Sequence, residues 1–238
     1  MKIFASLIFL IFYSSIQANA GDFAKRHIHG FSVDGGLFAF EEYGRQDGSG
    51  FPYSNLYVID TQNDQWTAGS PFRTLLKDET KSVFDAREES SILAGPVMKS
   101  FEDRGTIVAT NQPTEIGFDK KRILAYPRMV VPPIDDSIEF RLEIFSLNAS
   151  ETCESFGSSA AFKLLQIGTR DGQATRLLHE DKNIPASRNC PLNYDFADLV
   201  TYYPENKAPL AAIIILMQSV GFEGPNGRYL TITTQLGK

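Results

Sequence analysis

The stretch from Glu41 to Tyr53 gathers side chains whose chemistry suits a binding site. It reads EEYGRQDGSGFPY, so Glu41 and Asp47 supply carboxylates, while Phe51 and Tyr53 supply aromatic rings. Carboxylates accept hydrogen bonds, aromatic rings offer amphipathic contact surfaces, and the glycines between them free the backbone to present both. We therefore predict that Glu41, Asp47, Phe51 and Tyr53 form a binding surface for a protein segment or a saccharide.

The same acids leave two alternatives open. Glycosidases need two carboxyl groups flanking the scissile bond. Neighbouring strand residues point to opposite faces, so Glu41 and Glu42 cannot form that pair, and Asp195 or Asp198 would have to supply the second carboxylate. A hydrolase acting on an envelope polysaccharide is thus one alternative to a binding module, although we predict no catalytic residue and favour a non-enzyme. The other alternative is a purely structural secreted protein.

No motif in the chain predicts a metal or a cofactor. The acids of the 41–49 loop lack the spacing of a calcium-binding loop, and His27 and His29 have no third zinc ligand identified by a motif. Ser49 stands in Gly-Ser-Gly, a turn, rather than in the G-x-S-x-G elbow of serine hydrolases. We expect neither a metal site nor a bound cofactor.

Strand patterns dominate the elements that must position these residues. Residues 37–43, 55–60 and 138–147 alternate apolar and polar side chains, as half-buried strands do. Leu210 to Met217 is continuously apolar, which predicts a strand covered on both faces, and residues 224–227 form a turn into a last strand. We predict a mainly β fold of antiparallel sheets, sandwich-like or partly propeller-like, with the final hairpin at its centre.

One segment predicts a helical insertion, around residues 78–103. Acidic residues and Thr80 stand near its start, Gly95-Pro96 is expected to break or kink it, and Gly105 is expected to cap its C-terminus. Its apolar residues have spacings compatible with one helical face: Val83, Phe84, Ile92, Leu93, Val97 and Phe101.

The first 20 residues predict a cleaved signal peptide. Lys2 precedes an apolar run too short to span a membrane, and Ala18-Asn19-Ala20 is a cleavage signal. Residues 21–238 then form a single secreted domain, with a possible seam at the prolines near 127–135 and no transmembrane anchor. Removing the leader changes the formal charge from −6 to −7. This acidic balance disfavours nucleic acid as a partner.

Cys153 and Cys190 are the two cysteines of the chain. An exported protein meets an oxidising compartment, and neither residue belongs to a C-x-x-C motif. We predict that they form a disulfide, and that the protein is secreted or periplasmic.

Several phrases carry a resemblance to a known family. Residues 30–60 (GFSVDGGLFAFEEYGRQDGSGFPYSNLYVID), 184–200 (IPASRNCPLNYDFADLV), 177–181 (LLHED) and 221–230 (GFEGPNGRYL) resemble a family of bacterial predicted secreted proteins, described only as a domain of unknown function. The resemblance implies export in a bacterium and one module, with no activity and no assigned site. Residues 30–60 also resemble one blade repeat of the TolB-type β-propellers.

Overall fold

The apolar run near the end of the chain forms the central strand of the protein. In the computed structural model, which describes residues 21–116, 119–149 and 151–237, Leu210–Ser219 is strand β13. Ile214 packs into one hydrophobic core and its neighbour Ile213 into another. Successive side chains of a strand point to opposite faces, so a strand buried on both sides must be apolar throughout. The prediction of a doubly covered strand is confirmed.

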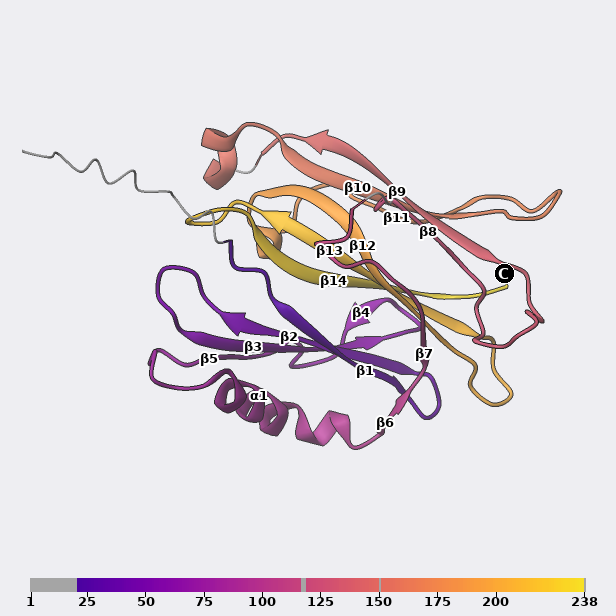
Figure 1. Cartoon of the computed structure of the whole chain (residues 1–238), viewed down its shortest axis with the longest axis horizontal. Helices are drawn as coiled ribbons and strands as arrows, with labels where there is room; N and C mark the ends of the chain where they lie inside the picture. Colours follow the sequence, from indigo (N-terminus) through magenta and orange to yellow (C-terminus); the bar gives the residue numbers. More distant parts are fainter. Residues whose placement is uncertain (1–20, 117–118, 150, 238) are drawn as a thin grey trace, which may run out of the picture.

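Three antiparallel sheets stack on one another, with β13 in the middle sheet (Figure 1). The strand order of the middle sheet is β14-β13-β12-β7, with β7 at Thr106–Thr110, β12 at Pro191–Tyr202 and β14 at Asn226–Gln235. Among the named strands β14 pairs only with β13, and on its other edge a single bridge joins Gly227 to Phe23. The predicted central hairpin is confirmed for the core, because β14 places Tyr229 in one hydrophobic core and Ile232 in the other, although β14 itself is an outer strand of its sheet.

The first part of the chain builds the N-terminal sheet, below the middle sheet in Figure 1. Its strand order is β4-β3-β2-β1-β6, and β5 pairs with β3 beside β4. The strands are β1 (Lys25–Ser32), β2 (Leu37–Arg45), β3 (Pro52–Asp60), β4 (Gln65–Trp66), β5 (Phe72–Leu75) and β6 (Phe101–Arg104).

The outer sheet covers the opposite face of the middle sheet and has the order β11-β10-β9-β8. Its strands are β8 (Arg122–Ala125), β9 (Ile138–Leu147), β10 (Ser159–Ile167) and β11 (Arg176–Glu180). Two short 3-10 helices flank these strands, η1 at Glu151–Phe156 and η2 at Ala186–Arg188. β9 has the bounds that the alternating pattern predicted.

Each pair of neighbouring sheets encloses a hydrophobic core. The first core joins the N-terminal and middle sheets, and the second joins the middle and outer sheets. Fully burying one such aromatic or branched side chain stabilises the fold by roughly 1.5–3 kcal/mol relative to leaving it exposed. Representative members are Phe38, Phe40, Leu216 and Tyr229 in the first core, and Phe140, Phe162, Phe196 and Ile215 in the second.

The predicted helical insertion is the helix α1, Val83–Met98. Ser82 caps its N-terminus in a capping box with Asp85, which satisfies otherwise unpaired N–H groups of the first turn. The helix continues through Pro96 to Met98, with Lys99 as its C-cap, so Gly95-Pro96 does not break it and the predicted cap at Gly105 is wrong. Whether the helix is kinked there stays a prediction. Gly105 has a φ of +120° and lies where the chain leaves β6 for β7.

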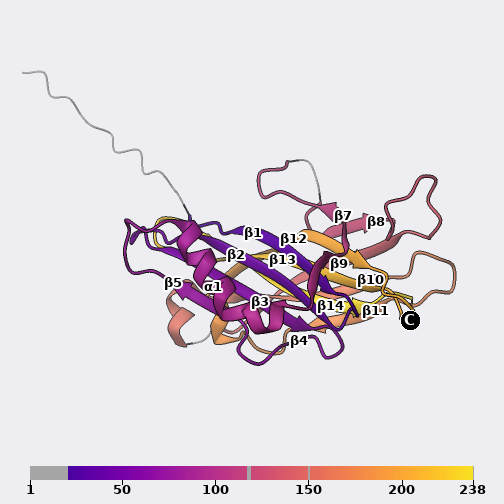
Figure 2. The same cartoon turned by 90° about the horizontal axis from the view of Figure 1, so that it is seen from below.

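The helix packs on the N-terminal sheet (Figure 2). Val97 and Phe101 of the predicted face contact the core there, but the fully buried positions belong to another face. Its buried residues are Ala86, Ser90 and Ala94, whereas Phe84 and Ile92 are each 70% exposed. Small side chains four residues apart let the helix backbone approach β3 closely. The apolar spacing thus predicted the helix but not the side that it buries.

These observations confirm the predicted mainly β class with antiparallel sheets and one helical insertion. The resemblance of residues 30–60 to a propeller blade stays unconfirmed. The single domain with a seam near residues 127–135 also stays a prediction, and the predicted signal peptide lies outside the described residues. Within the described part of the chain, no helix is both long enough and apolar enough to cross a bilayer.

Candidate functional site

Glu41 and Glu42 are neighbours on β2 that serve opposite layers of the fold. Glu41 is 3% exposed and turns towards α1. The guanidinium of Arg87 donates to both of its carboxylate oxygens over 2.8–3.1 Å, and the Ser54 hydroxyl donates to Oε1 over 2.8 Å. Glu41 therefore joins the helix to the N-terminal sheet.

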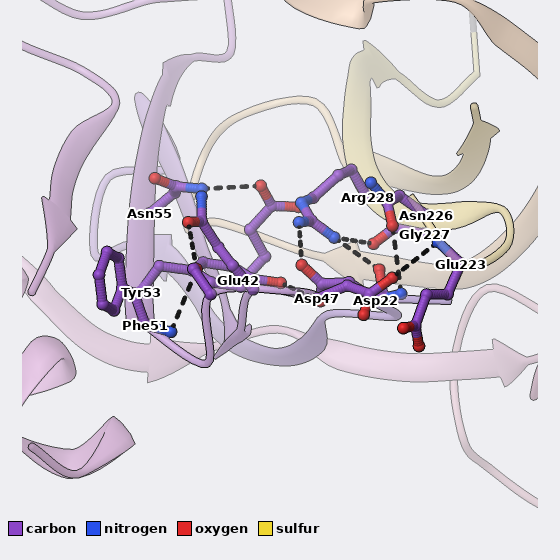
Figure 3. A network of polar contacts seen from close by, with 12 residues as sticks. Asp22, Glu42, Asp47, Phe51, Tyr53, Asn55, Glu223, Asn226, Gly227 and Arg228 are labelled. Carbon is purple, nitrogen blue, oxygen red and sulfur yellow. Dashed lines mark hydrogen bonds and ion pairs between the residues drawn. The ribbon is translucent and has the colours of Figure 1, made fainter. Parts of the chain in front are cut away.

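Glu42 lies on the other face of the sheet, between the N-terminal and middle sheets (Figure 3). Its Oε1 accepts from Asn55 Nδ2 over 3.0 Å and from the Tyr57 hydroxyl over 2.9 Å, and its Oε2 accepts from the backbone N–H of Tyr229 over 2.8 Å. Burial raises the pKa of this carboxyl against the effect of these donors. Glu42 thus connects β2 and β3 with the edge strand β14.

Tyr53 is the second buried member of the predicted surface, with 4% of its area exposed. Its hydroxyl donates to Asp22 Oδ1 over 2.9 Å, and the Arg228 guanidinium lies 4.7 Å from the centre of its ring (Figure 3). Arg228 also forms an ion pair with Asp22 and donates to the Asp22 carbonyl over 2.7 Å. Burial raises the pKa of the Tyr53 phenol. This network joins the start of the described chain to β3 and β14.

Asp47 and Phe51 stand in the turn between β2 and β3 and are half-buried. Asp47 accepts a hydrogen bond from the backbone N–H of Glu223 over 3.0 Å, which ties this turn to the turn between β13 and β14. Gly48 and Gly50 have φ angles of +79° and +66°, conformations that favour glycine. The structure does not gather the four predicted residues on one surface, and their binding of a partner stays a prediction.

A groove runs along the free edge of β14, and Tyr53 and Glu42 both contribute to its lining. Its volume is about 860 Å³. Residues 228–232 are five consecutive positions of β14 that line it, and consecutive positions indicate that the strand presents its edge rather than one face. The opposite sides come from β2, β3 and β5 of the N-terminal sheet and from residues 185–189, which include η2. We call this site the β14 groove.

A row of aromatic rings leads from the first core into the β14 groove. Phe40 stacks on Tyr57 with 4.7 Å between ring centres, and Tyr57 lies 5.8 Å from the ring of Trp66. Trp66 is 51% exposed and is the single tryptophan of the chain. A half-exposed aromatic ring on a rigid stack offers a flat apolar surface to a ligand at little cost in conformational entropy.

Two hydroxyl groups beside the groove have no hydrogen-bond partner among the described residues. They are the Oγ1 atoms of Thr74 on β5 and Thr231 on β14, and the side chain of Thr74 is 6% exposed. A buried hydroxyl without a partner costs roughly 1–3 kcal/mol. Buried polar groups without a partner are uncommon in folded proteins. A polar ligand in the groove would supply the missing hydrogen bonds to these two hydroxyl groups.

Two carboxylates cap the free edge of β14. Glu42 accepts from the N–H of Tyr229, and Asp64 accepts from the N–H of Thr233 over 2.6 Å. Alternate residues of an antiparallel strand direct their N–H groups to the same edge, so positions 229, 231 and 233 share the free edge. Glu42 and Asp64 occupy two of these three donors. A peptide could pair along this edge only by displacing both carboxylates.

The remaining candidates from the sequence lie in separate ion pairs. Asp195 forms an ion pair with Lys121 over 2.6 Å, Asp198 forms one with Arg26, and neither acid lines the groove. The rings of His27 and His29 contact edge to face, 4.7 Å apart. In the described ranges, no three side chains of histidine, cysteine, aspartate or glutamate are grouped so as to hold a metal ion.

The predicted disulfide between Cys153 and Cys190 is confirmed. Cys153 is buried in η1, and Cys190 directly follows Asn189, one of the groove-lining residues. The bond therefore anchors the segment that carries η2 to the connection between β9 and β10.

Comparison with known families agrees with the resemblance seen in the sequence. The model of a family of predicted secreted proteins of unknown function, DUF2259, matches residues 39–235, which include β3 to β14 and every residue that lines the groove. The chain belongs to this family. Membership supports secretion and confirms the family resemblance, and it assigns no activity. No curated protein matches the chain, and no solved structure matches it.

Sequence reasoning missed most of the groove. Trp66, Arg73 and Thr74 follow β3 with no motif to single them out, and residues 185–189 are more than 100 positions further along the chain. The signal that existed was compositional: Trp66 is a lone tryptophan in a polar stretch of the sequence. Only the pairing order of the strands shows that these segments meet.

Proposed function

We propose that the protein is an exported, envelope-associated binding module and that the β14 groove is its ligand site. The observation that carries this proposal is a groove of about 860 Å³ that combines a half-exposed aromatic ring, Trp66, with the buried hydroxyl of Thr74, which has no hydrogen-bond partner among the described residues. Ligand sites are concave, mostly preformed and lined by apolar rings with a few polar groups. Secretion of the family supports a ligand in the cell envelope or beyond it.

The capped edge of β14 supports a saccharide rather than a protein segment as the ligand. Peptides often bind as an added strand, through main-chain hydrogen bonds to a free sheet edge. Here Glu42 and Asp64 already occupy two outward N–H groups of that edge. A saccharide needs no strand pairing. It can stack a ring face on Trp66 and exchange hydrogen bonds with side chains such as Asn55 and Thr74.

Hydrolysis finds weaker support than binding. A general acid needs a raised pKa in a groove, and Glu42 meets that requirement. Among the described lining residues, however, Glu42 is the single acid, and both of its oxygens already accept hydrogen bonds from protein groups. A glycosidase needs a second carboxylate.

Fluorescence of Trp66 provides a direct test, because the single tryptophan lies in the groove. The mature protein would be titrated with oligosaccharides released from bacterial envelopes, and a saturable change in emission is expected. Ser187→Phe places a large ring at an exposed position of η2 beside the groove and should abolish the change. Ser155→Phe, at an exposed position of η1 outside the groove lining, is the matched control and should bind like the wild type.

Two results would contradict the proposal. One is a folded protein whose emission no envelope saccharide changes. The other is a response that Ser187→Phe leaves intact, since the ligand would then bind elsewhere. Release of new reducing ends during the titration would instead favour the hydrolase.

A further inference from the structure

The lining of the β14 groove contains more basic than acidic side chains, although the chain as a whole is acidic. The whole chain has a formal charge of −6. Three arginines line the groove, at positions 73, 188 and 228, against the single acid Glu42. A concave site with one sign of charge concentrates ligands of the other sign, even on a protein whose net charge repels them.

The three arginines differ in how far the protein already uses them. Arg228 is half-buried and engaged in its ion pair with Asp22. Arg73 is exposed on β5, and its side chain makes no ion pair or hydrogen bond with another described residue. It is therefore a cation whose donors are available to a ligand.

Arg188 is intermediate between these two. Its Nη1 donates to Asp181 Oδ2 over 2.8 Å and to the Tyr194 hydroxyl over 3.3 Å. No described residue accepts from its Nε or Nη2. The buried Asp181 holds the guanidinium in place beside the rings of Phe162 and Tyr194, so Arg188 adds a fixed, largely buried positive charge to the lining of the groove.

We infer that the ligand of the β14 groove is an acidic saccharide, a sugar chain whose carboxylate or phosphate groups are bound by Arg73, with Arg188 as a second positive charge of the lining. This inference rests on the proposed function and adds its ligand class. Guanidinium groups bind such anions in forked, charge-assisted hydrogen bonds, while the ring of Trp66 accepts the apolar face of a sugar. Neither contact requires the capped edge of β14.

The test compares matched pairs of oligosaccharides that differ only in charge. One pair is tetragalacturonate and its methyl ester, and the other is a phosphorylated mannan fragment and the same fragment after dephosphorylation. Binding would be followed by Trp66 emission at low ionic strength. A charge-assisted hydrogen bond contributes enough for the acidic member of at least one pair to bind about tenfold more tightly than its neutral partner. Added salt should reduce this preference. The pair that responds identifies the acidic group.

Substitutions at the exposed position 73 should leave the stability of the fold unchanged, so that a change in affinity reports on binding alone. Arg73→Gln should remove most of the preference for the acidic member, and Arg73→Lys should retain part of it, because lysine keeps the charge but not the fork. Arg141→Gln, at an exposed arginine of β9 on the outer sheet, is the matched control and should leave the preference unchanged.

The possible failures separate the two proposals. Equal affinity for both members of each pair would overturn the acidic ligand and leave a saccharide-binding groove. A full preference in Arg73→Gln would overturn the assignment to Arg73. Binding of no saccharide by the folded wild type would overturn the proposed function, and this inference with it.

Discussion

Removal of the Cys153–Cys190 disulfide should destabilise the protein and loosen one side of the groove. The suitable variant is Cys153→Ala with Cys190→Ala, because a serine at the buried position 153 would leave a hydroxyl without a partner. The double substitution also avoids a free thiol. In the folded state the bond holds residues 185–189 beside β14, through Cys190.

The size of the effect follows from the loop that the bond closes. The two cysteines are 37 positions apart. On the chain-entropy model, a cross-link at that separation lowers the entropy of the unfolded chain enough to stabilise the fold by about 4 kcal/mol. The variant should also show a larger dependence of unfolding free energy on denaturant, because its unfolded chain exposes more surface.

Guanidinium denaturation followed by circular dichroism measures both quantities. Wild type in reductant, with thiol titration to establish that the bond has opened, is the control and should approach the variant, while the variant itself should not respond to reductant. A loss of less than about 1 kcal/mol would refute the entropic reasoning. If the Trp66 titration detects a ligand, its affinity should fall in the folded variant, since residues 185–189 lose their anchor.

Two further predictions concern ion pairs of the N-terminal and outer sheets. Arg87→Ala should lower the free energy of unfolding by about 3 kcal/mol, because it leaves the buried Glu41 carboxylate without the arginine. Glu41→Gln should lower it by only about 1 kcal/mol, because water reaches the guanidinium of Arg87. Equal losses of unfolding free energy in chemical denaturation would contradict this reasoning. Arg122, and then Arg141, lower the pKa of the Glu139 carboxyl from its ordinary 4.5 to about 2. The folded protein therefore binds this proton less readily than the unfolded chain, so the stabilisation is present above pH 4.5 and is lost as the pH falls towards 2. Glu139→Gln should flatten the unfolding free energy across that window, and an unchanged slope would show that other groups produce it.

Local patterns were sufficient for much of the fold. The continuous apolar run at Leu210 to Met217 required a strand covered on both faces, because its side chains alternate between the two faces and all of them are apolar. The alternation over residues 138–147 defined β9, and two cysteines in a secreted chain made a disulfide the expected outcome. These inferences depend on the spacing of apolar residues or on the number of cysteines, and both can be read directly from a sequence.

The rotation of α1 about its axis could not be predicted from the local sequence. Phe84, Ile92 and Leu93 have the apolar spacing, yet they are exposed while Ala86, Ser90 and Ala94 are buried. Close approach to β3 needs small side chains, and the ion pair of Arg87 with Glu41 selects the same rotation of the helix. A hydrophobicity pattern contains neither constraint.

The sequence by itself determined the secreted class, the antiparallel β architecture, the helix and the disulfide. The tertiary structure alone decided the site. Glu41 and Tyr53 looked like surface ligands in a polar loop, but long-range pairing buries them against α1 and Arg228. The β14 groove exists because β14 is an edge strand that faces β3, β5 and residues 185–189. Which strand becomes an edge depends on the pairing order of the whole sheet, and contacts between residues more than 100 positions apart set that order.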